Sequence, residues 1–134
     1  MANKFNITYK QYSYKAIAMS SKINTTVFHN NCAFEKFLSS GSLAFLPLQF
    51  DISAVIWCFP ENQFSIIRSW NQKQLSQEIQ SIFGSNLGSL HFFENQQYTK
   101  LNLKIANQHI SHRLVLIGNS AQTIHPIAGQ GLNL

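Results

Sequence analysis

The residues best suited to bind a ligand gather near the end of the chain, in the run LVLIGNSAQTIHPIAGQGLNL that begins at Leu114. An apolar stretch ends at Gly118, polar residues and a His125-Pro126 pair follow, and Gly129-Gln130-Gly131 comes next. Two glycines one residue apart allow backbone conformations and close approaches that other residues cannot adopt. A helix starting at Gln130 would turn its free N–H groups toward this loop, where phosphates and carbonyl groups are natural ligands.

The spacing leaves two interpretations open. A Gly-x-Gly pair is common, so the segment could equally be an ordinary strand–loop–helix connection. The dinucleotide fingerprint G-x-G-x-x-G is absent, because Leu134 stands where its third glycine belongs. The loop over 118–131 is also too long for the tight turn of that fingerprint.

A family resemblance favours the first interpretation. The stretch over 118–133, and HPIAGQGLN within it, resembles the second FAD-binding motif of the ubiquinone-biosynthesis FAD-dependent hydroxylases. The likeness is strongest to the 2-octaprenyl-6-methoxyphenol hydroxylase type, within the para-hydroxybenzoate hydroxylase-type flavin monooxygenases. Stretches 33–37, 41–48 and 55–58 resemble the substrate domain of that family in order and spacing. The resemblance extends over roughly residues 11 to 134.

The resemblance implies a set of FAD-binding residues. Asn119 stands where the family usually has an aspartate that bonds the ribose, and a neutral amide makes the weaker hydrogen bond. The His125-Pro126 corner would lie near the flavin ring, and backbone amides near Gly131 would face its pyrimidine end and the pyrophosphate. The implied cofactor residues are Gly118, Asn119, His125, Pro126, Gly129, Gln130, Gly131, Leu132 and Asn133.

By the same resemblance, the activity is FAD-dependent monooxygenation of an aromatic ring. The substrate would be a polyprenylated phenol and molecular oxygen a co-substrate, while the sequence identifies no electron donor. Two alternatives stay open, a non-catalytic remnant and a sister hydroxylase with another substrate or ring position. Association with other ubiquinone-biosynthesis proteins is a further implication.

Three motifs of the family do not occur in the sequence: the first G-x-G-x-x-G, the central Asp-Gly and the closing Gly-x-x-Asp. The resemblance therefore predicts an internal fragment that would be inactive by itself and would bind no FAD.

The elements expected to position these residues form an α+β fold. Residues 1–112 are predicted to be an antiparallel β-sheet substrate domain with one helix. Residues 113–134 would be a strand and Gly-rich loop of a Rossmann-like FAD-binding domain. Asn71 caps the helix over 71–83 and Gly84 ends it. Strands are predicted over 14–19, 25–28, 43–48, 52–59 and 92–110, with a short segment over 34–38 that ends in a turn, and a strand buried on both faces over 114–117.

Two aromatic residues, Phe45 and Trp57, are candidates for a substrate pocket, although aromatic residues on strands more often belong to the core. The remaining histidines lack partners at metal-ligand spacing, so no metal site is predicted. Cys32 and Cys58 are too far apart in sequence for a C-x-x-C site and are expected to be mostly buried, reduced thiols.

The composition excludes several classes of protein. The chain is 45% hydrophobic and 11% charged with a net charge of +5, and its basic residues are spread out. Nucleic-acid binders carry denser basic stripes, so none is expected as a partner. No apolar run reaches the length of a membrane span, which leaves at most peripheral membrane contact. No secretory signal is visible, so a cytoplasmic location is expected.

Overall fold

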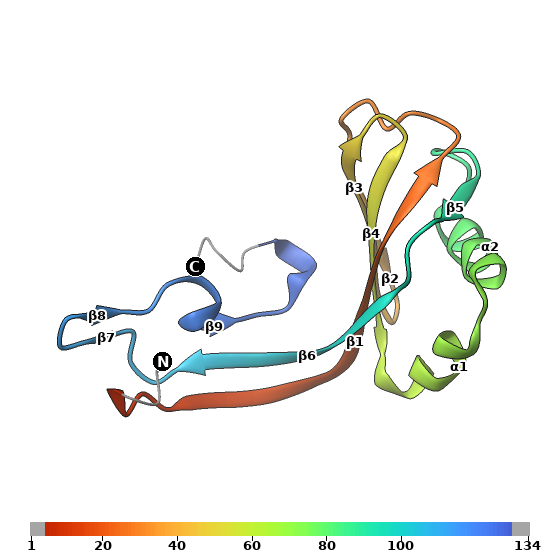
Figure 1. Ribbon diagram of the computed structural model, residues 1–134. Helices are drawn as coiled ribbons and strands as arrows, with labels where there is room; N and C mark the ends of the chain where they lie inside the picture. Colours follow the sequence, from red (N-terminus) through yellow and green to blue (C-terminus); the bar gives the residue numbers. More distant parts are fainter. Residues whose placement is uncertain (1–4, 130–134) are drawn as a thin grey trace. The chain divides into compact units, whose positions relative to one another are not determined.

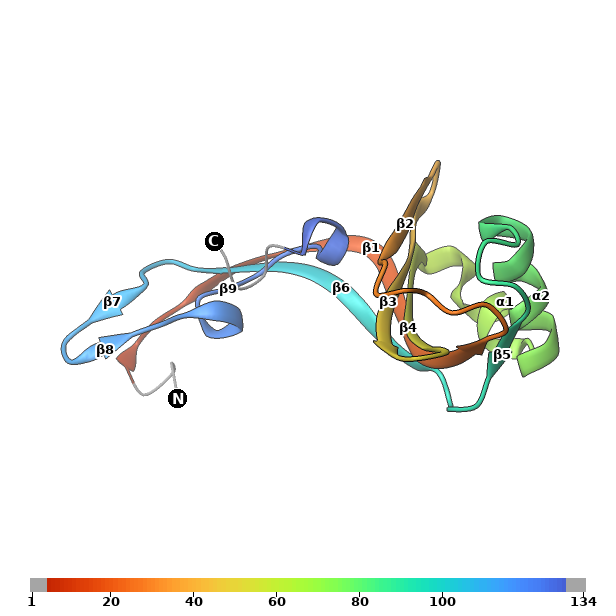
Figure 2. The same cartoon turned by 90° about the horizontal axis from the view of Figure 1, so that it is seen from above.

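The computed structural model describes residues 5–129, although not the side chain of Ala128. The chain forms two compact units (Figures 1 and 2). The large unit is Ala16–Lys100, and the small unit combines Met1–Lys15 with Leu101–Leu134. Two strands, β1 (Tyr9–Thr25) and β6 (Gln97–Ala106), contribute residues to both units.

An antiparallel sheet forms the frame of the large unit. Its strands lie in the order β2-β3-β4-β1, and β5 pairs with the end of β1. Trp57 on β4 lies opposite Leu43 on one side and Met19 on the other. The strands not yet given bounds are β2 (Phe34–Leu38), β3 (Gly41–Gln49), β4 (Ile52–Pro60) and β5 (Leu90–Phe92).

Helices follow β4 and pack beside the sheet (Figure 1): η2 (Glu61–Gln63), α1 (Phe64–Ser69) and α2 (Gln72–Phe83). Asn71 and Gln74 cap α2 reciprocally, each accepting the other's backbone N–H through its side-chain oxygen at 2.9 and 3.0 Å. Gly84 ends the helix with a φ of 97°, a conformation that glycine reaches easily. The predicted helix, its cap and its stop are confirmed.

The core of the large unit lies between the helices and one face of the sheet. Apolar residues of α2 recur at helical spacing, so they fall on one face of the helix. Phe83 packs against Phe45 at 4.4 Å and against Phe34 at 5.7 Å between ring centroids. The buried members include Ile17, Met19, Ile23, Leu43, Phe45, Val55, Trp57, Phe59, Leu75, Ile79 and Phe83.

The small unit is built around β6, which lies between β1 and β9 (Gln122–Thr123) in the sheet. A separate two-residue hairpin pairs β7 (Ile110–Ser111) with β8 (Leu114–Val115). Its own small core holds Ile7, Ala106, Leu116 and Ala121, with Tyr9 and Leu114 packed against them. The 3-10 turns η3 (Gly118–Ser120) and η4 (Pro126–Ala128) complete the described part.

Several predicted elements differ from the structure. The strand over 114–117 was expected to be parallel-type and buried on both faces, which is wrong: β8 is antiparallel, and Val115 and Ile117 are exposed. A strand is buried on both faces only when other layers cover it, and the described residues supply no such cover. The predicted strand over 25–28 is also wrong, because β1 continues unbroken to Thr25 and the chain then bends.

The extent of one strand and the presence of one helix were also predicted incorrectly. The predicted strand over 92–110 is divided among β5, β6 and β7, since bends interrupt it at both ends of β6. Helix α1 was not predicted, because it is six residues long and has no side-chain cap.

Candidate functional site

The candidate cofactor segment, residues 118–129, begins with a tight 3-10 turn. The Ala121 N–H donates to the Gly118 carbonyl at 2.9 Å, and the Ser120 hydroxyl donates to the Ile117 carbonyl at 2.6 Å. Gly118 has a φ of 55°, in the left-handed region that glycine adopts at least cost. Asn119, at the centre of this turn, is exposed.

The segment is anchored to the rest of the small unit from the end of that turn onward. The Tyr9 hydroxyl donates to the Ser120 carbonyl at 2.8 Å. The Ala106 N–H donates to the Ala121 carbonyl at 2.8 Å, and β9 then continues the antiparallel pairing, with Thr123 opposite Lys104. Residues 118–123 are therefore held by the neighbouring strand β6 and by β1, which lies more than a hundred positions away in the sequence.

His125 fixes the start of the second turn. Its Nδ1 accepts the Ile127 N–H at 3.2 Å, so the neutral imidazole acts as the cap of η4. The ring lies edge-on to Tyr14, with 5.1 Å between centroids. Burial lowers the pKa of His125 below its ordinary value, which keeps the ring neutral and able to accept.

Gly129 ends that turn with its N–H donating to the Pro126 carbonyl at 2.9 Å. Its φ is 62°, and a Cβ built there would meet no atom within 4 Å. The backbone is therefore open on that side, as a close approach by a ligand requires. The predicted cofactor residues Gln130, Gly131, Leu132 and Asn133 lie outside the described residues.

The charge of the chain is distributed unevenly between the two units. All five acids lie between Glu35 and Glu94, within the large unit, where five basic residues balance them. The small unit has no acid in its sequence, so it carries the whole net charge of +5, from Lys4, Lys10, Lys15, Lys104 and Arg113. A positive unit with an exposed glycine turn favours an anionic ligand.

The two aromatic residues proposed for a substrate pocket lie elsewhere. Phe45 is 1% and Trp57 is 5% exposed, and both belong to the core of the large unit. Trp57 stacks on Trp70 at 6.3 Å, and Phe45 packs on Phe83. Their burial favours the alternative that the sequence left open, that of ordinary core residues.

Sequence reasoning missed a cavity of about 620 Å³ that lies between α2 and β5. It is lined largely by amide and hydroxyl side chains of α2, such as Gln72, Ser76 and Gln80, together with His91 and Phe92. These residues are the polar face of an amphipathic helix, and nothing in that pattern distinguishes a cavity wall from a solvated surface.

Residues 5–129 hold no group of three or more possible metal ligands. Within the same range, no helix is long and apolar enough to cross a membrane. Cys32 is exposed and Cys58 buried, so the expectation of mostly buried thiols holds for Cys58 alone.

The sequence of the chain is similar to those of known hydroxylases. No protein-family profile matches it. The ubiquinone hydroxylase UbiL of Rhodospirillum rubrum is 32% identical over 105 residues, which cover 78% of this chain and 24% of that protein. The 3-demethoxyubiquinol 3-hydroxylase of Escherichia coli is 34% identical over 101 residues, 75% of this chain and 26% of the relative.

The fold has a solved counterpart as well. The crystal structure of a flavoprotein/dehydrogenase from Cytophaga hutchinsonii superimposes with a TM-score of 0.75, over 99% of this chain and 34% of that one, at 13% identity. The chain spans about a quarter of the length of the two hydroxylases. The resemblance inferred from its motifs is confirmed: by sequence, the chain is a relative of the ubiquinone-biosynthesis hydroxylases, matched over one segment of them.

Proposed function

We propose that the chain forms part of a FAD-dependent monooxygenase that hydroxylates the ring of a polyprenylated phenol in ubiquinone biosynthesis. Support comes from two relatives, which are named ubiquinone hydroxylase UbiL and 3-demethoxyubiquinol 3-hydroxylase. The observation that carries the proposal is the exposed turn at Gly129, in a unit with five basic residues and no acid.

FAD fits the residues that the structure describes. Its pyrophosphate is anionic, which suits the positive small unit. Gly118 and Asn119 would receive the ribose, whose hydroxyls can hydrogen-bond the exposed Asn119 amide. The open backbone at Gly129, followed by Gln130, Gly131, Leu132 and Asn133, would approach the flavin and the pyrophosphate.

When bound, reduced flavin supplies the oxygen-transfer chemistry with molecular oxygen. The protein residues would bind and orient. His125 would form a neutral corner beside the ring together with Pro126, because its Nδ1 is already occupied by the Ile127 N–H. Phe45 and Trp57 are core residues, so they would support the substrate domain and would not line a pocket themselves.

The proposed division of labour places substrate binding in residues 1–112 and cofactor contact in 113–134. An antiparallel sheet with helices on one face supports the first assignment. A sister hydroxylase with another phenolic substrate or ring position would use the same arrangement.

A segment exchange tests the proposal. The part of the E. coli hydroxylase that matches this chain would be replaced by the present sequence, and the purified chimera examined for bound flavin. We expect a yellow protein with a bound-FAD spectrum that restores ubiquinone synthesis in a strain lacking the hydroxylase. In the same chimera, Gly129→Val should lower FAD content because the branched side chain is strained at positive φ and fills the open side.

Ile66→Ser is the matched control, since Ile66 is exposed on α1 and outside the proposed site. A chimera with a native-like circular dichroism spectrum but no flavin would contradict the proposal. Equal FAD content in the Gly129→Val and Ile66→Ser chimeras would contradict the placement of the cofactor.

A further inference from the structure

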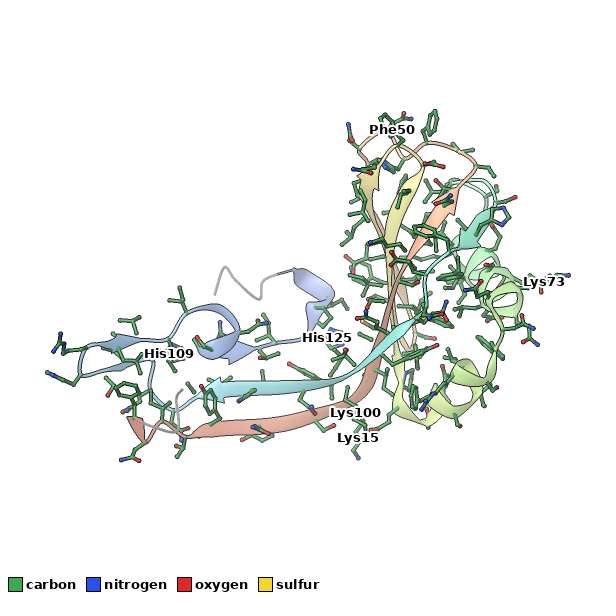
Figure 3. The ribbon with its side chains drawn as sticks, in the orientation of Figure 1. Lys15, Phe50, Lys73, Lys100, His109 and His125 are labelled. Carbon is green, nitrogen blue, oxygen red and sulfur yellow. The ribbon has the colours of Figure 1, made fainter. Side chains whose placement is uncertain are left out.

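One end of the large unit presents large apolar side chains to solvent. Phe50, in the β3–β4 turn, is 82% exposed, and Phe28, in the loop after β1, is 63% exposed. Val27 and Leu48 are each about half exposed. Figure 3 shows Phe50 at the extreme end of this sheet, beyond the last paired residues of β3 and β4. We call Val27, Phe28, Leu48 and Phe50 the apolar loop tip.

The two loops of the apolar loop tip are bonded into one structure. The Thr25 N–H donates to the Asp51 carbonyl at 2.8 Å, directly beside Phe50. The Thr25 hydroxyl lies within 2.8 Å of the Val27 carbonyl and 3.1 Å of the Asp51 carbonyl. The Val27 N–H donates to the Leu87 carbonyl at 3.1 Å. The apolar side chains are therefore positioned by the fold.

The backbone at Phe50 has a φ of 42°, within the left-handed region. Glycine and asparagine are the usual residues at such turn positions, whereas an aromatic residue there is an outlier. Phe50 therefore combines a strained backbone conformation with an apolar side chain exposed to water. This combination points to a function at the surface.

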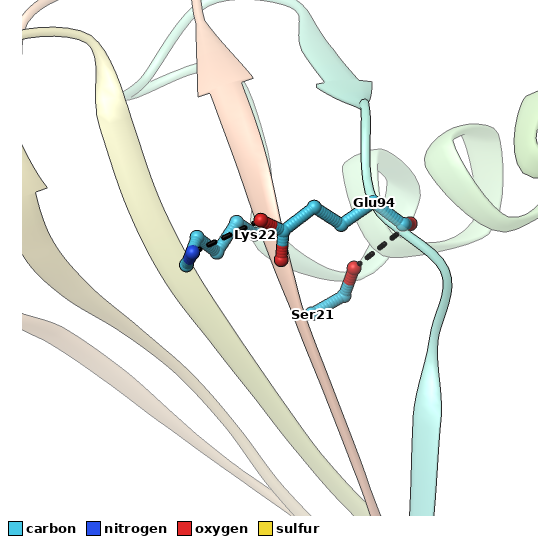
Figure 4. A network of polar contacts seen from close by, with 3 residues as sticks. All are labelled: Ser21, Lys22 and Glu94. Carbon is cyan, nitrogen blue, oxygen red and sulfur yellow. Dashed lines mark hydrogen bonds and ion pairs between the residues drawn. The ribbon is translucent and has the colours of Figure 1, made fainter.

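A groove of about 390 Å³ opens next to the apolar loop tip. It is lined by Lys22, Leu48, Gln49, Ile52 and Phe93. The Lys22 ammonium lies 2.9 Å from a Glu94 carboxylate oxygen, and the Glu94 carbonyl accepts the Ser21 hydroxyl at 3.2 Å (Figure 4). Leu48 belongs to both the groove and the apolar loop tip, so the two form one continuous surface.

We propose that the apolar loop tip docks on a lipid bilayer surface. Phe50 and Phe28 would insert among the acyl chains. The exposed apolar area is roughly 400–450 Å² when a fully exposed aromatic side chain counts as 150–250 Å². A stable protein partner needs about 800 Å² on each side, which two loop ends do not supply.

Lipid imposes no such minimum, because a few inserted side chains bind reversibly in proportion to their buried apolar area. Membrane docking is a property beyond the proposed function, and its link to a polyprenylated substrate rests on that function. Docking itself needs no flavin, but a polyprenylated substrate would be held in the same bilayer.

Flotation with lipid vesicles tests the proposal on the full chain without flavin. Vesicles of phosphatidylcholine, alone or mixed with phosphatidylglycerol, would be incubated with the wild type, Phe50→Asn and Phe28→Ser. Asparagine tolerates positive φ, so Phe50→Asn should fold at least as well as the wild type. We expect it to lower partition onto both kinds of vesicle by about tenfold, as the loss of one inserted aromatic side chain implies.

Phe37→Asn is the matched control. Phe37 is 68% exposed on β2 and pairs with Ser42 at the opposite end of β3, roughly 25 Å from Phe50 at about 3.3 Å per residue. Its binding should stay within about twofold of the wild type.

Four outcomes would overturn the proposal. The wild type could fail to float, the two tip variants could bind like the wild type, or Phe37→Asn could lose as much binding as Phe50→Asn. The fourth is a wild-type dimer on size exclusion that Phe50→Asn converts to monomer, which would make a second copy the occupant. Because the assay contains no FAD, none of these outcomes bears on the flavin proposal, which the chimera tests separately.

Discussion

The Tyr14 and His125 rings meet edge to face, with 5.1 Å between centroids and 85° between ring planes. The residues are more than a hundred positions apart in the sequence, and both belong to the small unit. This contact joins the first strand of the chain to the turn that would face a cofactor. The burial that accompanies it lowers the pKa of His125.

The protonation state of His125 should therefore make the stability of the 3-10 turn η4 depend on pH. Because its pKa is depressed in the folded chain, the unfolded chain binds the proton more readily. The stabilising contribution of neutral His125 is complete above its ordinary pKa of 6.5 and is lost as the pH falls through the lower folded value. Hydrogen exchange at the Ile127 amide should accelerate over that range, relative to the intrinsic rate.

His125→Asn is the control for this prediction. Asparagine supplies a side-chain acceptor at the cap position but does not titrate, so protection of Ile127 should persist at low pH. Parallel loss of protection in both proteins would show that the sensitivity arises at another group.

Replacing the cap of α2 should weaken the large unit by a predictable amount. Asn71→Ala removes the side-chain acceptor for the Gln74 N–H, while the backbone N–H at position 71 can still donate to the Gln74 side chain. The expected cost is about 0.5–2 kcal/mol in the free energy of unfolding. Asn71→Ser should restore most of it, because serine is also a good cap. Chemical denaturation followed by circular dichroism measures the free energy of unfolding of both variants. An Asn71→Ala variant as stable as the wild type would contradict a stabilising role of Asn71 as the helix cap.

The aromatic cluster around Phe83 should be the most sensitive part of the core. Phe83→Ala removes ring contacts with Phe34 and Phe45 and leaves a cavity, at a cost of about 3–5 kcal/mol. Ile66→Ala, on the exposed side of α1, should change the free energy of unfolding by less than about 0.5 kcal/mol. Similar costs for the two variants in denaturant unfolding would show that Phe83 is not buried as described.

Gly41 should tolerate no side chain. A Cβ there would lie 1.9 Å from the Cys58 carbonyl oxygen of the paired strand, so Gly41→Ala must push β3 and β4 apart. At Gly84 a Cβ meets nothing within 4 Å, and Gly84→Ala bears only the strain of positive φ. We expect soluble yield and thermal stability to fall much further for Gly41→Ala. The reverse order would exclude the described β3–β4 register.

The two thiols should react at very different rates. Burial raises the pKa of Cys58, and the thiolate is the reactive form, while Cys32 is exposed. Iodoacetamide should label Cys32 in the folded chain and Cys58 only after denaturation, as mass spectrometry of the peptides would show. Rapid labelling of both in the folded chain would contradict the burial of Cys58.

Local patterns in the sequence predicted the parts of the fold that local chemistry determines. Asn71, the apolar spacing of Leu75 and Ile79, and Gly84 define a helix without tertiary information. The β3–β4 hairpin follows in the same way from two apolar runs separated by a short polar turn.

The rest depends on contacts between distant residues. The apolar run at Leu114 was expected to be buried, but apolar content alone does not say whether another layer covers a strand. The hydrogen bond from Tyr9 to Ser120 and the contact of Tyr14 with His125 leave no local trace in the sequence. Gly118 and Gly129 were assigned to the candidate site through the family resemblance, and both have positive φ. Their assignment to a cofactor stays a prediction.

The sharing of β1 between two units has a consequence for synthesis on the ribosome. The backbone at Lys15 has a φ of 50°, and the boundary between the units falls directly after it. Residues 16–100, which form the large unit, are all synthesised before the small unit can close. The first residues of β1 leave the ribosome early but must wait for β6 and β9, whose loop closure is the longest in the chain. During that interval Tyr9–Lys15 is a nascent strand without its partner strands.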